Sequence, residues 1–177
     1  FSATPEIMLP FINGINFKLK NQTKIILFRA PTRYIKLLNY STTAWFDFYL
    51  DPETSFIKPE PESIEVSRQL FKKYIDEEAK VLGNNYERII LGGHSLGAMM
   101  TFHTGLSIDK KLGGLFVLSG YLFPETRIYD EERKNINMIV THGENDTIIK
   151  VNIQRKSFER IYDFTNTTIK YYDDLII

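Results

Sequence analysis

The segment Gly93-His94-Ser95-Leu96-Gly97 has the residue types and spacing of a turn that presents a nucleophilic serine. It follows the apolar residues 88–92 and precedes the helix-prone residues 98–102, so we expect a strand before the turn and a helix after it. In that geometry the Ser95 hydroxyl stands clear of the sheet, and the backbone N–H of Leu96 faces the carbonyl under attack. The pattern predicts a serine hydrolase. The alternative interpretation is a glycine-rich turn with an idle serine.

A serine hydroxyl becomes a good nucleophile when a histidine takes its proton and a carboxylate orients that histidine. In α/β-hydrolases the acid follows the serine in the chain. Asp146 lies in a loop directly after a predicted strand, so it is the candidate acid. The other interpretation is an aspartate that forms a turn or caps a helix ahead of residues 147–150.

The chain holds three histidines, and none is well placed to act as the base. His94 lies inside the turn, where its side chain should point away from Ser95. His103 follows the serine by two helical turns and is expected to be a packed or surface residue. His142 is close to Asp146 in sequence, which favours a structural role. An unconventional base from His103 or His142 stays an alternative.

Alternating strand and helix patterns predict an α/β fold with a mostly parallel sheet and helices on both faces. Strands are expected at residues 23–29, 88–91, 114–119, 137–141 and 168–172. Helices are expected at residues 5–13, 63–81, 96–106 and 151–162, with a helical turn at 130–134. Ser63 is the expected cap of the longest helix.

Residues 40–62 combine large rings with three prolines, which is typical of an ordered loop over a sheet edge. Trp45 and Phe46 are candidates for the wall of a substrate groove in this loop. The equally open interpretation is that the rings fill the core beneath a long connection.

The composition excludes several classes of protein. Lys plus Arg equals Asp plus Glu at 22 each, so no net field attracts nucleic acid. No cysteine is present for a disulfide or thiolate, and the scattered histidines argue against a metal site; no cofactor is expected. No apolar stretch reaches the length of a membrane span. The sequence begins at Phe1 rather than methionine, so we expect an upstream segment to be left out.

Along the chain lie, in order, Arg29-Ala30-Pro31, Ala44-Trp45-Phe46-Asp47, the strand and turn of residues 88–97, and His142-Gly143-Glu144-Asn145-Asp146. They resemble the His-Ala-Pro, Trp-Phe-Asp, elbow and His-Gly-x-x-Asp motifs of the acyl-protein thioesterase, or phospholipase/carboxylesterase, family of α/β-hydrolases. The family's elbow usually reads Gly-Phe-Ser-Gln-Gly. His94 and Leu96 depart from it without loss of the backbone N–H that catalysis needs.

This resemblance covers nearly the whole chain and implies one α/β-hydrolase domain over residues 1–177, incomplete at both ends. It implies that the second oxyanion N–H belongs to Phe1 and that the catalytic histidine follows Ile177. Implied substrates are acylated proteins, lysophospholipids or small esters. No cofactor is expected because this chemistry uses only side chains and water, and the lack of cysteine is compatible with the cytoplasmic location that we expect. The alternative is a hydrolase homologue without its base that serves as a structural or interaction subunit of a larger assembly.

Overall fold

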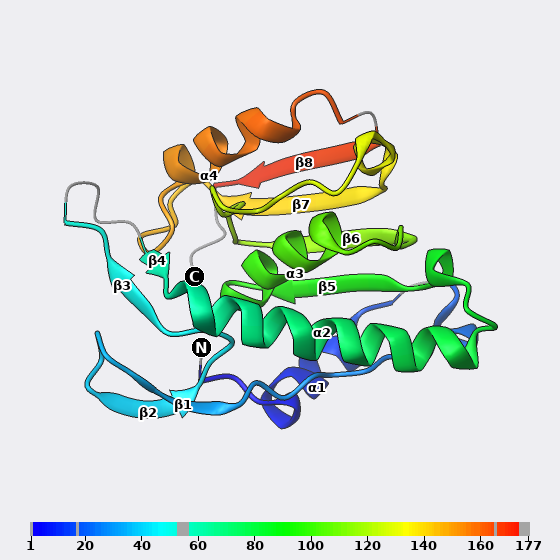
Figure 1. Ribbon diagram of the computed structural model, residues 1–177, viewed down its shortest axis with the longest axis horizontal. Helices are drawn as coiled ribbons and strands as arrows, with labels where there is room; N and C mark the ends of the chain where they lie inside the picture. Colours follow the sequence, from blue (N-terminus) through cyan, green and yellow to red (C-terminus); the bar gives the residue numbers. More distant parts are fainter. Residues whose placement is uncertain (1, 17, 53–56, 165, 174–177) are drawn as a thin grey trace.

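The centre of the molecule is a parallel sheet, whose strands lie one below another in Figure 1. The computed structural model describes residues 2–16, 18–52, 57–164 and 166–173. The sheet consists of β5 (Ile90–His94), β6 (Gly114–Leu118), β7 (Met138–Gly143) and β8 (Thr167–Tyr172), in that spatial order. Every neighbouring pair is parallel, so the carboxyl ends of all these strands meet at one edge. The predicted α/β architecture with a parallel sheet is confirmed.

Three helices pack against one face of this sheet. They are α2 (Pro61–Val81), α3 (Leu96–Ser107) and α4 (Val151–Phe158). The alternate strand residues that point toward them form the core: Leu91, Leu115, Val117, Met138 and Val140. The rings of Phe102 on α3 and Phe158 on α4 meet edge to face at 5.4 Å, which joins the two helices over the sheet. The strand residues that point to the other face of the sheet are more exposed: Ile90 is 73% exposed and Ile139 is 50% exposed.

Residues 23–29 form no strand, which corrects the prediction for this apolar run. Ile25 and Ile26 are exposed, and Phe28 stacks on Tyr74 of α2 at 4.8 Å between ring centroids. A strand needs a neighbour for its backbone hydrogen bonds as well as a favourable composition. Within the described residues no strand pairs with this segment, so side-chain packing on α2 decides its path.

The predicted loop of residues 40–62 contains strands, which is a second correction. β1 (Thr32–Ile35) pairs antiparallel with β2 (Tyr40–Thr43), and β3 (Phe48–Leu50) pairs antiparallel with β4 (Ile57–Pro59). Both pairs lie near the carboxyl ends of the central sheet in Figure 1. Pro59 is compatible with a strand here because a two-stranded ribbon has open edges that need no N–H donor.

The remaining elements follow the predicted pattern with shifted ends. α1 is Pro5–Gly14, and short 3-10 helices lie at Lys20–Gln22, Tyr86–Arg88, Glu131–Asn135 and Glu159–Ile161. Arg88 ends one of these turns, so β5 begins later than expected. The predicted helix 151–162 is α4 followed by a 3-10 turn at Glu159–Ile161, a common way for an α-helix to end.

Candidate active site

Ser95 occupies a strained turn between β5 and α3. Its φ and ψ are 55° and −120°, a conformation that costs a residue with a side chain about 1–3 kcal/mol. The turn is held from both sides, because the Ser95 N–H donates to the Leu118 carbonyl at 3.0 Å and the Met99 N–H donates to the Ser95 carbonyl at 3.1 Å. Ser95 therefore lies at the carboxyl edge of the sheet, at the beginning of a helix.

The backbone N–H of Leu96 is the first of α3, directly after the serine. The first N–H groups of a helix have no acceptor within it, and the helix dipole is positive at this end. The Leu96 side chain is only 2% exposed, so its backbone is anchored in the core. An oxyanion beside Ser95 could accept this N–H. The second predicted oxyanion donor, Phe1, lies outside the described residues.

Asp146 follows β7 at the same edge of the sheet as Ser95. Its Oδ1 accepts the N–H groups of Ile148 and Ile149, both at 2.8 Å, and the residue is 6% exposed. The turn-forming interpretation of this aspartate is thus correct for one oxygen of the carboxylate. It does not cap α4, whose N-cap is Lys150. Oδ2 is left for another donor.

The loop that carries Asp146 is tied to the elements beside it. The Glu144 N–H donates to the Tyr172 carbonyl at 3.0 Å, and the Asn145 amide donates to the Asp173 carbonyl at 2.9 Å. The Glu144 carboxylate also pairs with Arg155 of α4. These contacts fix the loop to the end of β8 and to α4, so the position of Asp146 is determined by the sheet.

None of the histidines makes a hydrogen bond with the Ser95 hydroxyl in the described part of the chain. His142 is fully buried, and its Nε2 lies 2.7 Å from the Ile149 carbonyl. His103 lies with Nδ1 3.0 Å from Thr126 Oγ1, and burial lowers its pKa to about 4. Burial also lowers the pKa of His94. The packed role expected for His103 and the structural role expected for His142 agree with these positions.

The two aromatic candidates for a groove lie in different environments. Trp45 is partly exposed, and its indole Nε1 lies 3.5 Å from where a Cβ on Gly97 would be. Phe46 is fully buried and contacts Phe123 edge to face at 5.4 Å, so it belongs to the core and does not fit the groove-lining role. Only Trp45 is placed beside the serine turn.

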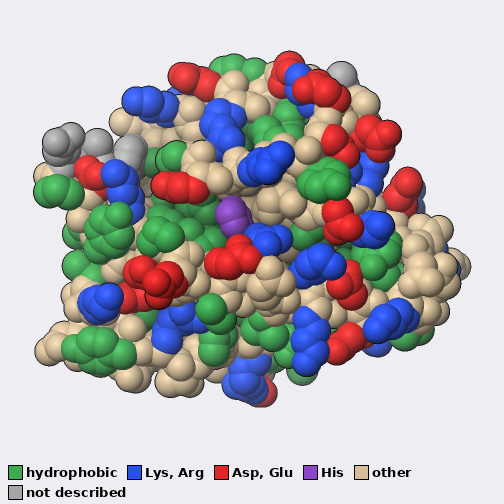
Figure 2. All heavy atoms as spheres, in the orientation of Figure 1, with side chains coloured by type: hydrophobic (Ala, Val, Ile, Leu, Met, Phe, Trp, Pro, Cys, Tyr) green, Lys and Arg blue, Asp and Glu red, His purple; other side chains and the backbone are tan. Residues whose placement is uncertain are grey.

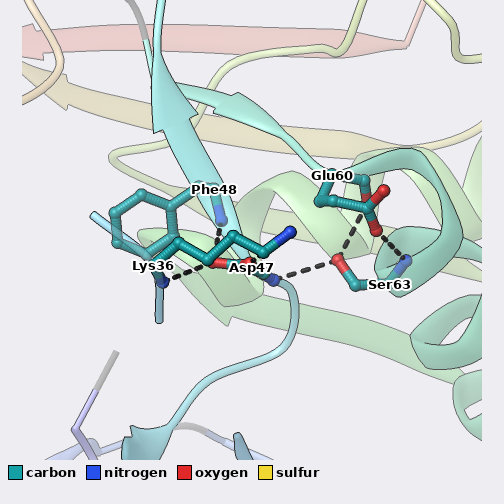
Figure 3. A network of polar contacts seen from close by, with 5 residues as sticks. All are labelled: Lys36, Asp47, Phe48, Glu60 and Ser63. Atoms are coloured by element: carbon teal, nitrogen blue, oxygen red, sulfur yellow. Dashed lines mark hydrogen bonds and ion pairs between the residues drawn. The ribbon is translucent and has the colours of Figure 1, made fainter. Parts of the chain in front are cut away.

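A polar network holds the Trp45–Phe46 segment in place (Figure 3). Asp47 Oδ1 accepts the N–H of Phe48 at 2.9 Å and that of Lys36 at 3.2 Å. The Asp47 N–H donates to the Ser63 hydroxyl at 2.9 Å. The predicted cap is therefore corrected: α2 begins at Pro61, so Ser63 lies within its first turn, and the Glu60 carboxylate caps the helix by accepting the Ser63 N–H at 3.0 Å.

Ser119 is a residue of this edge to which sequence analysis gave no role. It follows β6 with φ 51°, it is 1% exposed, and its N–H donates to the Thr141 carbonyl at 2.9 Å. Two residues later, the Tyr121 hydroxyl donates to the Ile57 carbonyl, which joins this loop to β4. The only sequence sign was a Ser-Gly pair at a strand end, a pattern that ordinary turns share.

The surface in Figure 2 mixes positive and negative side chains over the face formed by α2. Ion pairs such as Lys72–Asp76 and Arg68–Glu65 account for part of this mixing. The described residues include no group of three or more His, Cys, Asp or Glu side chains arranged to hold a metal ion. Among the described helices, none is both long and apolar enough to cross a bilayer.

Comparison with known proteins gives the same assignment as the motifs. The family model described as Phospholipase/Carboxylesterase matches residues 10–176. The chain is 33% identical over 155 residues to acyl-protein thioesterase 1 of Eremothecium gossypii, covering 82% of this chain and 63% of that protein. It is 33% identical over 132 residues to lysophospholipase-like protein 1 of Mus musculus, covering 71% and 54% respectively.

Solved structures agree in fold. SOBER1 of Arabidopsis thaliana matches with a TM-score of 0.82 at 21% identity, covering 99% of this chain and 85% of that one. Acyl-protein thioesterase 2 of Zea mays matches with a TM-score of 0.76 at 19% identity, covering 99% and 81%. Sequence identities this low establish the α/β-hydrolase fold alone. The family model that matches residues 10–176 also establishes the family. The chain belongs to the phospholipase/carboxylesterase family of α/β-hydrolases.

Proposed function

We propose that this protein is a serine hydrolase that cleaves carboxylic esters or thioesters through an acyl-enzyme on Ser95. The observation that carries the proposal is the backbone of Ser95, at φ 55° between β5 and α3, on the sheet edge that also holds Asp146. A strained non-glycine residue persists where the surroundings fix it, and such residues cluster at functional sites. Family membership supports the same chemistry.

In the proposed reaction, the Ser95 Oγ attacks the acyl carbonyl while a histidine base takes its proton. The N–H of Leu96, together with that of Phe1, holds the oxyanion of the tetrahedral intermediate. The intermediate collapses to an acyl-serine as the base returns the proton to the departing alcohol or thiol. Water then attacks the acyl-serine by the same steps, which releases the carboxylic acid and restores Ser95. Asp146 Oδ2 orients the base, for which the resemblance implies a position after Ile177.

The proposed substrates follow the names of the relatives. They are S-acylated protein cysteines, as in acyl-protein thioesterase 1, and lysophospholipids, as in lysophospholipase-like protein 1. Both place an acyl carbonyl at the end of a long apolar chain. The partly exposed ring of Trp45 beside the serine turn offers an apolar surface for that chain.

A fluorophosphonate probe tests the proposal on the protein expressed from its complete gene. We expect covalent labelling of the unmodified protein and of Ser107→Ala, but none of Ser95→Ala. Ser107 is the matched control because it ends the same helix that Ser95 precedes. Thioester hydrolysis should fall about 1000-fold or more in Ser95→Ala. Unchanged hydrolysis in Ser95→Ala would reject the proposal, and absence of labelling in the unmodified protein would favour an inactive homologue in a larger assembly.

A further inference from the structure

His142 and Asp146 lie side by side in the buried loop after β7. His142 Nε2 is 2.7 Å from the Ile149 carbonyl oxygen and 3.6 Å from Asp146 Oδ2. We propose that His142 is a positioning residue that orients the Asp146 carboxylate by holding the backbone of Ile149. This inference rests on the proposed function, in which Asp146 is the acid. It gives a role in catalysis to a histidine that does not contact the nucleophile.

The hydrogen bond to Ile149 determines the protonation of His142. A carbonyl oxygen only accepts hydrogen bonds, so Nε2 must carry the hydrogen. Nδ1 is buried and has no hydrogen-bond partner within the described residues. A hydrogen on Nδ1 would be a buried donor without an acceptor, which costs free energy. Leaving Nδ1 without a hydrogen costs less. The geometry therefore places the ring hydrogen of His142 on Nε2 and favours a bare Nδ1.

Ile149 links the imidazole to the carboxylate through a single residue. Its carbonyl accepts from His142 Nε2 at 2.7 Å, and its N–H donates to Asp146 Oδ1 at 2.8 Å. The Ile148 N–H donates to the same Oδ1 at 2.8 Å. A buried ring thus fixes the backbone that in turn fixes one carboxylate oxygen.

The consequence is that the two oxygens of Asp146 are distinguished. Oδ1 is occupied by two backbone donors, whereas Oδ2 lies 3.6 Å from Nε2, beyond a normal hydrogen bond. Oδ2 is therefore the oxygen available to an N–H of the catalytic base. Without the Nε2 donor, the Ile149 carbonyl becomes a buried unpaired acceptor, and the turn that holds Oδ1 loses its support.

The same geometry excludes His142 as the base. Its side chain is fully buried, and its Nε2 hydrogen is engaged with Ile149. The remaining ring nitrogen has no path to the Ser95 hydroxyl through any hydrogen bond of the described residues. His142 instead acts on Asp146, through the backbone of the single residue Ile149.

The test compares substitutions that keep or remove the donor. Glutamine places its amide nitrogen near the position of Nε2, whereas asparagine reaches only the position of Nδ1 and methionine fills the space without a donor. We expect His142→Met and His142→Asn to lower kcat about 10- to 100-fold with KM changed less than about 2-fold. His142→Gln should restore kcat to within about 5-fold. In His142→Met and His142→Asn, which place no donor at the position of Nε2, the base titrates at lower pH in the kcat/KM profile because its imidazolium has lost an oriented partner.

A second measurement does not depend on activity. The ¹⁵N shifts of the His142 ring should report hydrogen on Nε2 and a bare Nδ1; the opposite tautomer would overturn the inference. Equal kcat in folded His142→Asn and His142→Gln would also overturn it, whether or not His142→Met folds. Hydrolysis that survives Ser95→Ala would instead reject the proposed function, so the two failures are distinguishable.

Discussion

A Cβ atom placed on Gly93 would overlap the backbone carbonyl of Gly97 and lie 2.8 Å from the Ala98 nitrogen. The strand that leads into Ser95 and the helix that leaves it are therefore in backbone contact at this point. The glycine spacing around the serine is a steric requirement of the turn. Gly92, one residue earlier, differs because its nearest neighbours are the Cβ and carbonyl oxygen of Phe116 at 3.4 Å.

The first prediction is that Gly93→Ala destabilises the protein much more than Gly92→Ala. The overlap at Gly93 involves backbone that cannot rotate away, so the helix must move. We expect a loss of about 1–3 kcal/mol or more in the free energy of unfolding, measured by urea denaturation. Gly92→Ala should stay within about 1 kcal/mol of the unmodified protein. Equal midpoints for the two variants would contradict the close approach.

The second prediction concerns charge at Asp146. Asn at this position keeps the shape and an oxygen that can accept the N–H groups of Ile148 and Ile149. We expect Asp146→Asn to keep nearly normal thermal stability while kcat for thioester hydrolysis falls about 10⁴-fold, because the base loses the carboxylate that stabilises its imidazolium.

Asp130→Asn is the matched control, since the Asp130 carboxylate likewise accepts a backbone N–H, that of Arg133 at 3.2 Å. It should leave kcat unchanged. An Asp146→Asn variant with full activity would show that Asp146 serves only its turn.

The sequence predicted best those strands that pair with a neighbouring strand in the described structure and those helices that bury an apolar side. β6, β7 and β8 lie close to their predicted ranges because each pairs with a described neighbour, and α2 and α3 bury a continuous apolar side. Residues 23–29 have strand composition but no described partner strand, and composition alone does not provide one. Antiparallel ribbons such as β3–β4 depend on pairing between short segments, which periodicity over three residues does not reveal.

The parts of the candidate site that short sequence motifs build could be predicted from the sequence. The glycine turn around Ser95 and the loop that carries Asp146 after β7 follow directly from motif spacing. The different environments of Trp45 and Phe46 follow from tertiary packing, since adjacent rings point to opposite sides of an extended chain. The bond between His142 and Ile149 joins residues that the sequence gave no reason to pair.

The third prediction concerns Trp45 as an apolar contact for the acyl chain. Its ring lies beside the serine turn and packs edge to face on Phe71 at 4.7 Å. We expect Trp45→Leu to raise KM for long-chain thioesters about 10-fold and to change KM for acetyl esters little, because a long chain has far more apolar surface to bury against the ring.

The control for Trp45 is Tyr49→Leu, which removes a ring that is 48% exposed on β3. Its kinetic constants should not depend on chain length. An equal rise of KM for short and long acyl groups in Trp45→Leu would indicate a general disturbance of the turn.

The last prediction follows from the burial of His103. Burial lowers its pKa from 6.5 to about 4, against a smaller raising effect of Glu65. Between these values the unfolded chain binds a proton that the folded protein does not, so acidification from pH 6.5 toward pH 4 reduces stability. One such proton changes the free energy of unfolding by at most about 1.4 kcal/mol per pH unit. His103→Asn keeps a polar atom near Thr126 but does not titrate. Its unfolding free energy should therefore depend less steeply on pH in this window and equally above pH 7. Identical slopes at pH 4.5–6 would contradict a partly buried His103 whose pKa is lowered.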